Sequence, residues 1–197
     1  MIPVRLRFLL LSGVLVLSAC KNMGKKLTDP EPETPPIISI GNDADLALVR
    51  KYNADGNGYV RRWEQSTVGV YDQIGIPNLQ DVLNDWNAAM DGKLMLVIGD
   101  SQSPITIVTN TSMSEAGLTE YQTINYRIQS VKISINTPLT NPYWIAKHEL
   151  GHAIGFRGHT IAGGAMNTPM ESLTITDEVK RTLRKLYDLA PGTQLVP

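Results

Sequence analysis

Cysteine is almost absent from this chain, since Cys20 is the only one in 197 residues. No disulfide can form within one chain, so the fold has to be held by its hydrophobic core rather than by covalent cross-links. An excess of charge of one sign is also missing. The formal net charge is -1, and like charges do not form long runs. This balance argues against nucleic acid as a partner.

Long hydrophobic runs are missing as well. The longest apolar stretch, from Phe8 to Leu17, covers about ten residues, whereas a helix that spans a bilayer needs roughly 20. Two arginines precede this stretch and Leu-Ser-Ala-Cys closes it at Cys20, which is the layout of a secretory signal. The closing residues resemble the bacterial lipobox, in which the cysteine becomes an acylated N-terminus. We therefore expect a signal peptide over residues 1–19 and a lipid anchor at Cys20.

The residues that follow Cys20 contain many prolines and few apolar side chains. Such a segment cannot bury enough surface to order itself, so we expect a lipid-anchored tether over residues 20–40. Residues 41–197 have the length and composition of one domain, which we expect to be monomeric. Lys21 stands where some lipoproteins carry an aspartate that retains them in the inner membrane. The expected location is thus the outer membrane of a bacterial cell envelope, facing the periplasm or the exterior.

Apolar periodicity predicts an α+β domain of helices and short strands. Asn78, Asn141 and Thr176 are positioned to cap three of the helices, and Pro142 suits a first helical turn. The predicted helices cover residues 43–52, 78–90, 142–155 and 176–189, and the predicted strands cover residues 94–99, 105–110 and 131–136.

The stretch NADGNGYVRRWE, residues 53–64, has two interpretations. Its oxygen-bearing residues and Gly58 fall at the positions of a calcium-binding EF-hand loop. However, the loop begins with Asn53 rather than an aspartate, and the residues after Glu64 alternate like a strand. The second interpretation is a turn that feeds a strand starting near Tyr59 or Trp63. The turn is favoured, and Ca²⁺ remains the alternative.

Histidine is scarce too, and all three histidines lie within HELGHAIGFRGH, residues 148–159. His148 and His152 are four positions apart on a predicted helix, so their side chains share one face and can hold one ion. Gly155 can end the helix and turn the chain back, because glycine adopts a positive φ at little cost. His159 then becomes a third ligand. Three imidazoles with one open position are typical of catalytic Zn²⁺.

Glu149 follows the first histidine and is displaced about 100° around the helix axis. Its carboxylate can therefore face a water on the metal rather than the metal itself. Zinc lowers the pKa of its bound water, and Glu149 can act as the general base. After the attack on a carbonyl, the same residue can pass the proton to the leaving amine.

This stretch resembles the zinc motif of the metzincin endopeptidases, H-E-x-x-H-x-x-G-x-x-H, whose second mark is a methionine turn beneath the metal. Met166 looks like that methionine, and Met170 is a weaker candidate. Thr168 stands two residues after Met166, where some metzincins carry a tyrosine ligand, so a tyrosine ligand is not expected. The segment 167–176 would then line the specificity pocket.

Among the metzincins, the sequence resembles the matrix-metalloprotease-like branch most. It implies a metzincin-like zincin domain: a twisted mixed β-sheet, a zinc-binding active-site helix and a C-terminal helix. In this branch a strand led by tryptophan, a helix with a tryptophan on its face and an Ile-x-Ile-x-Asn strand precede the zinc helix. The corresponding segments are Trp63 to Tyr71, Leu79 to Met90, and Ile133 to Asn136.

Two functions from different classes are compatible with these residues. The first is a zinc-dependent endopeptidase that acts on protein or peptide substrates through a metal-activated water and Glu149. The second is a noncatalytic zinc-binding lipoprotein that serves as a binding module. A structural zinc site usually fills its fourth position with a protein ligand, and no residue is spaced for that role. We therefore expect the enzyme.

Overall fold

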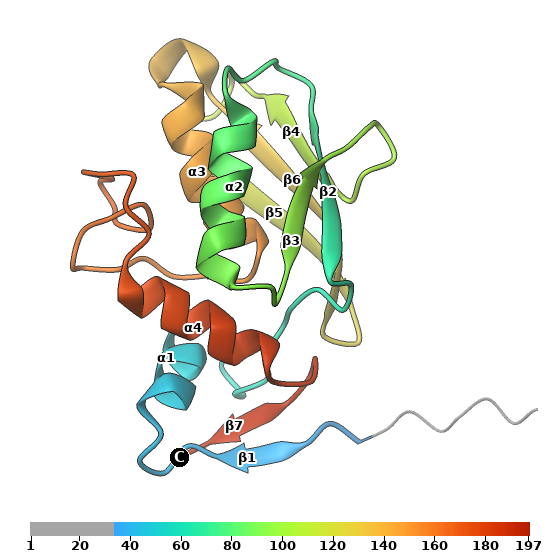
Figure 1. Cartoon of the computed structure of the whole chain (residues 1–197), viewed down its shortest axis with the longest axis vertical. Coiled ribbons are helices and arrows are strands. Elements are labelled where there is room, and N and C mark those ends of the chain that lie inside the picture. Colours follow the sequence, from blue (N-terminus) through green and yellow to red (C-terminus); the bar gives the residue numbers. More distant parts are fainter. Residues whose placement is uncertain (1–33) are drawn as a thin grey trace, which may run out of the picture. The chain divides into compact units, whose positions relative to one another are not determined.

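The computed structural model describes residues 34–197, which form one compact unit from Thr34 to Pro197. The predicted signal peptide, Cys20 and most of the predicted tether lie outside the described residues. Within the described part, the chain folds into four α-helices, one 3₁₀ turn and seven strands (Figure 1). In chain order these are β1 (Ile37–Ser39), α1 (Ala44–Tyr52), β2 (Thr67–Asp72), α2 (Leu79–Met90), β3 (Met95–Ile98), β4 (Ile105–Thr109), β5 (Gly117–Ile124), β6 (Arg127–Ile135), η1 (Thr137–Leu139), α3 (Pro142–Ala153), α4 (Asp177–Tyr187) and β7 (Gln194–Val196).

Five strands form the main sheet in the order β3-β2-β4-β6-β5. The first four run parallel, and β5 pairs with β6 in the antiparallel sense. This arrangement confirms the predicted mixed α+β class. β5 stands at one edge of the sheet and has no strand on its outer side among residues 34–197. β1 and β7 pair separately as a small parallel sheet.

Helices α2 and α3 cover one face of the main sheet (Figure 1). The apolar stripe that predicted α2 is the stripe that the fold buries. Two fully buried tryptophans fix α3 against the rest of the core. The indole Nε1 of Trp86 donates to the carbonyl of Lys147 at 3.0 Å, and that of Trp63 donates to the carbonyl of Ala153 at 2.9 Å. Both indoles thus satisfy their polar group while their rings fill the core.

The predicted helix caps have mixed outcomes. Asn141 caps α3 as expected, because its side chain accepts a hydrogen bond from the backbone of Tyr143, and Pro142 occupies the first turn. The prediction for Asn78 is wrong: this residue adopts a left-handed conformation, and its side chain makes no capping bond. Thr176 precedes α4 but makes no capping bond either. For these two helices the buried apolar stripe is the stronger determinant.

The start of the first sheet strand also differs from the prediction. β2 begins at Thr67, not near Tyr59 or Trp63. Tyr59 and Arg62 make only isolated bridges, to Gln194 and Arg127. Trp63 is fully buried beneath α3, so it serves the core and not the sheet.

Ile37–Ser39 form β1, within the range 20–40 that the sequence assigned to the tether. Folded structure therefore begins before residue 41. Within residues 34–197, each helix is too short or too polar to cross a membrane.

Candidate metal centre and catalytic cleft

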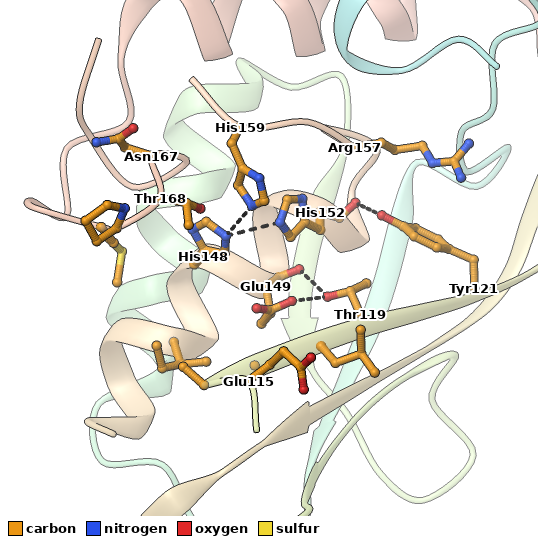
Figure 2. Close-up of a pocket in the computed structure, with 16 residues that line it drawn as sticks. Glu115, Thr119, Tyr121, His148, Glu149, His152, Arg157, His159, Asn167 and Thr168 are labelled. Atoms are coloured by element: carbon orange, nitrogen blue, oxygen red, sulfur yellow. Dashed lines mark hydrogen bonds between the residues drawn. The ribbon is translucent and has the colours of Figure 1, made fainter. Parts of the chain in front are cut away.

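The three histidines converge on one point, as Figure 2 shows. His148 and His152 project from α3, and His159 comes from the loop that follows the helix. The Nε2 atom of His148 lies 3.1 Å from the Nε2 atoms of both His152 and His159. The ligand atoms of all three lie within 4.8 Å of one another. The predicted histidine cluster is thus confirmed as a group that could hold a metal ion.

The outer ring nitrogens of two histidines are already engaged. Nδ1 of His148 lies 2.6 Å from the carbonyl oxygen of Ala165, and Nδ1 of His152 lies 2.6 Å from that of Phe156. A carbonyl only accepts, so each Nδ1 must carry the proton and donate it. Each Nε2 then presents a lone pair to the centre of the cluster. This outer contact is the usual arrangement of imidazoles that bind metals.

Two inward lone pairs at 3.1 Å cannot form a hydrogen bond with each other, and a cation between them would offset their repulsion. Burial lowers the pKa of His152 to about 4, and it also lowers the pKa of His148 and of His159. The imidazoles are therefore neutral near pH 7, which is the form that binds a metal. A tetrahedral ion at 2.0–2.1 Å from each nitrogen would separate the nitrogens by about 3.3 Å. The donor set and its spacing fit Zn²⁺.

The loop that carries His159 is one residue longer than in the metzincin pattern. Three residues, Phe156, Arg157 and Gly158, separate Gly155 from His159, where the pattern has two. The fold accommodates the extra residue against Tyr52. The ring of Phe156 stacks on that of Tyr52 with 4.5 Å between centroids, and the backbone N–H of Arg157 donates to the Tyr52 carbonyl at 2.6 Å. His159 therefore still reaches the cluster.

Gly155 ends α3 as predicted, with φ at 111°. A side chain here would be strained, and its Cβ would lie 2.8 Å from a methyl group of Leu186. Because the chain turns at this residue, the loop can return toward the helix that it has just left. This turn is what brings His159 beside His148 and His152.

Met166 lies fully buried beneath the histidine-bearing face of α3, next to Gly151. The neighbouring Ala165 supplies the carbonyl that orients His148. The backbone N–H of Ala165 donates in turn to Thr174 at 2.8 Å. The turn around Met166 therefore supports the histidine cluster from below. Met170, the weaker candidate for this place, lines the cleft instead.

Glu149 is buried beside the histidines, and its carboxylate faces the cleft (Figure 2). Burial raises the pKa of Glu149 to about 7, while a hydrogen bond from the hydroxyl of Thr119 opposes this rise. That hydroxyl lies 2.6 Å from Oε2 of Glu149. Gly117 leaves room for the other oxygen, because a Cβ at this position would overlap it. Glu149 is thus held next to the histidines without belonging to their cluster.

A cleft of about 680 Å³ opens over the cluster and the glutamate. Its walls are the edge strand β5, helix α3, the loop to His159 and the segment 167–170. Sequence reasoning identified the histidines and Glu149 but missed several other lining residues. These are Glu115, Thr119, Tyr121 and Arg157. The alternation of threonine and tyrosine in GLTEYQTI is the signal that would have predicted β5 and its inward side chains.

Residues 53–64 form a turn, the interpretation that the sequence favoured. The carboxamide of Asn53 donates to the carbonyls of Arg61 and Gly155 and accepts from the backbone of Arg61. Asp55 accepts from two backbone N–H groups and forms an ion pair with Arg61 at 2.8 Å. The oxygens of the proposed calcium loop therefore stabilise the turn itself.

Comparison with known protein families and with curated proteins gives no match for this chain.

Proposed function

We propose that this protein is a zinc-dependent endopeptidase. One observation carries the proposal: a buried carboxylate, Glu149, stands beside three convergent histidines in an open cleft. Among residues 34–197, no fourth histidine, cysteine or acidic ligand joins the cluster. A site that keeps one position free is typical of catalysis, whereas a structural zinc site is closed by a fourth protein ligand.

The residues of the chain have distinct tasks in this reaction. His148, His152 and His159 would hold the zinc ion, which supplies Lewis-acid activation of a water and of the substrate carbonyl. Glu149 accepts a proton from the water while the oxygen of that water bonds to the carbonyl carbon of the substrate. When the carbon–nitrogen bond breaks, Glu149 returns that proton to the leaving amine. Thr119 donates to Glu149 and keeps its carboxylate directed into the cleft.

The edge strand β5 supports a peptide as the substrate. Its inner edge pairs with β6, while its outer edge has no partner strand among the described residues. Gly117, Leu118, Thr119 and Tyr121 of this strand line the cleft. Free backbone N–H and C=O groups at a sheet edge can pair with an extended peptide. A substrate strand laid there passes beside Glu149.

We further propose that the fold is a metzincin-like zincin domain. Support comes from the parallel sheet with one antiparallel edge strand, from the zinc-binding helix α3, from the buried Met166 beneath it and from the C-terminal helix α4. The additional residue before His159 is a departure from the motif of that family, and it leaves the convergence of the histidines intact.

The location of the protein is a separate proposal. The sequence up to Cys20 favours a bacterial lipoprotein that is anchored through the acylated cysteine. We propose that the catalytic domain is held in this way at the outer membrane.

Replacement of Glu149 tests the proposed function most directly. Glu149→Ala should keep one zinc per chain and a normal melting temperature, but it should lower peptide hydrolysis by about 10² to 10⁴, the usual contribution of a general acid-base group. The measurement combines metal analysis, thermal unfolding and turnover of a peptide library in one preparation.

Glu120→Ala is the matched control, because Glu120 is an exposed residue of β5 that pairs with Lys132. This variant should retain full activity. An undiminished rate in zinc-loaded Glu149→Ala would contradict the mechanism. A wild type that cleaves no member of the library would instead favour the noncatalytic binding module.

A further inference from the structure

A second, smaller cavity adjoins the catalytic cleft. Its volume is about 160 Å³, and its walls are Arg61, Tyr121, Thr123, Ile128 and Arg157. Tyr121 and Arg157 also line the main cleft, so these two side chains border both cavities. We call this second cavity the arginine niche. Two of its five residues are cations.

Arg157 has a fixed backbone and an unpaired head group. Its N–H donates to the carbonyl of Tyr52 at 2.6 Å, within the lengthened loop between Gly155 and His159. The guanidinium lies 5.4 Å from the ring centroid of Tyr121 and points away from the histidines (Figure 2). Among residues 34–197, no carboxylate forms an ion pair with it.

Arg61 is held rigidly on the other side of the niche. Its guanidinium pairs with Asp55 at 2.8 Å, and its backbone is bonded at both ends to the side chain of Asn53. The turn that resembles a calcium loop is therefore the frame that positions this arginine. One carboxylate for two arginines leaves the niche with one unbalanced positive charge.

We propose that the arginine niche is a specificity subsite that binds a carboxylate side chain of the substrate, aspartate or glutamate. This inference rests on the proposed endopeptidase activity. A guanidinium matches a carboxylate through two parallel N–H···O bonds, and the aromatic face of Tyr121 holds it in place for that contact. The ionic partner that Arg157 lacks within the described residues is thus supplied by the substrate.

The position of the acidic residue follows from the spacing along β5. Thr119 contacts Glu149, and Tyr121 lies two residues further along the strand. At about 3.4 Å per residue this step is about 7 Å. A peptide that pairs with β5 should therefore place its acidic side chain two or three residues from the cleaved bond. Glu115 precedes β5 and lines the opposite part of the cleft, so an acidic residue is favoured on one side only.

Cleavage of a randomised peptide library, read by mass spectrometry, tests the subsite. Wild type should enrich aspartate and glutamate at one position, two or three residues from the cleaved bond. A synthetic peptide with glutamate there should be cleaved with about tenfold higher kcat/KM than its glutamine counterpart, which corresponds to one charge-assisted contact. Arg157→Gln should abolish this ratio, and Arg157→Glu should shift the preference to lysine and arginine.

Arg181→Gln is the matched control, because Arg181 is an exposed arginine of α4 that pairs with Asp45. It should leave the acidic preference unchanged. Zinc content and melting temperature of all variants should equal those of wild type. If wild type cleaves peptides without an acidic preference, or if Arg157→Gln keeps that preference, the subsite is disproved while the endopeptidase stands.

A second readout covers the case in which wild type cleaves nothing. The same library is then captured by immobilised, zinc-loaded Glu149→Ala protein and by the Glu149→Ala/Arg157→Gln double variant. Enrichment of acidic peptides by the first protein and not by the second supports the niche without the catalytic activity. Equal capture by the two proteins overturns it.

Discussion

At the scale of single residues, the buried carboxylate of Glu149 fits because its neighbour on β5, Gly117, has no side chain. A Cβ on Gly117 would overlap Oε1 of Glu149 and would come within 2.5 Å of a methyl group of Ile145. Both contacts are closer than real atoms approach. The glycine therefore determines where the carboxylate of Glu149 can lie.

Gly117→Ala should displace that carboxylate and lower kcat by about tenfold or more, because a misplacement of about 1 Å is costly in catalysis. Zinc content should stay at one per chain, since the histidine contacts are unaffected. Gly56→Ala is the control, because a Cβ there meets no atom within 4 Å. Equal kcat values for the two variants would show that Gly117 has no role in placing Glu149.

The sequence predicted the site residues that lie together on one helix. It missed the site residues that other secondary-structure elements contribute. His148, Glu149 and His152 share one helical period, so their proximity follows from spacing alone. Thr119 reaches Glu149 from a strand that ends well before α3 begins. Its contact depends on the docking of β5 against α3, and local periodicity carries no information about that docking.

At the scale of secondary-structure elements, α3 packs unusually closely on the layer beneath it. A Cβ on Gly151 would lie 2.7 Å from the ring of Trp86 and would overlap the sulfur of Met166. The glycine lowers the intrinsic helix propensity of α3. The close packing of α3 on the ring of Trp86 and the sulfur of Met166 compensates for this lower helix propensity.

Gly151→Ala should therefore reverse the usual effect of this substitution. At an exposed helix position, replacing glycine with alanine stabilises the helix by about 1 kcal/mol. Here overpacking should lower the free energy of unfolding by about 1–3 kcal/mol. Urea denaturation of the zinc-loaded protein measures the difference. A gain in stability would mean that the layer beneath α3 has space for a methyl group.

Elements with an apolar face were predicted, and the edge strand β5, which lacks one, was missed. α2 was predicted from six apolar side chains at helical spacing, and all six are buried. β5 was missed because its residues are half-buried or exposed and include Glu120 and Gln122. As an edge strand it covers little of the core, so its sequence lacks the alternating buried Val131, Ile133 and Ile135 that mark β6.

At the scale of the whole molecule, the metal would add a link between parts of the fold that already pack together. It would join α3 to the loop of His159, and through the Ala165 contact it would stabilise the turn around Met166. A ligand that binds only the folded state adds to stability in proportion to the logarithm of its concentration.

Removal of zinc by a chelator should lower the melting temperature of the wild type. Free zinc at 100 times its Kd contributes about 2.7 kcal/mol, which for a domain of this size corresponds to about 5–10 °C. His152→Ala should bind far less zinc and respond little to the chelator. Full zinc content in a variant that lacks all three histidines would exclude the proposed site.

The anchor is tested in cells of a bacterium that processes lipoproteins. The wild type should sediment with the outer membrane, whereas Cys20→Ser should remain unprocessed or appear in the soluble fraction. Membrane fractionation with an antibody against the domain distinguishes the two. Wild-type protein in the soluble fraction would contradict the lipid anchor.

The pairing of β1 with β7 joins the two ends of the described chain. The hydroxyl of Ser39 donates to the carbonyl of Pro197, 158 positions away, and the paired strands are only three residues long. Closing so long a loop costs more entropy than any local contact. β1 is half-buried or exposed, so its short pairing with β7 recovers little of that entropy. This junction should form late in folding and open first under protease or denaturant. Neither strand lines the cleft, so fraying at this junction would leave the histidine cluster intact.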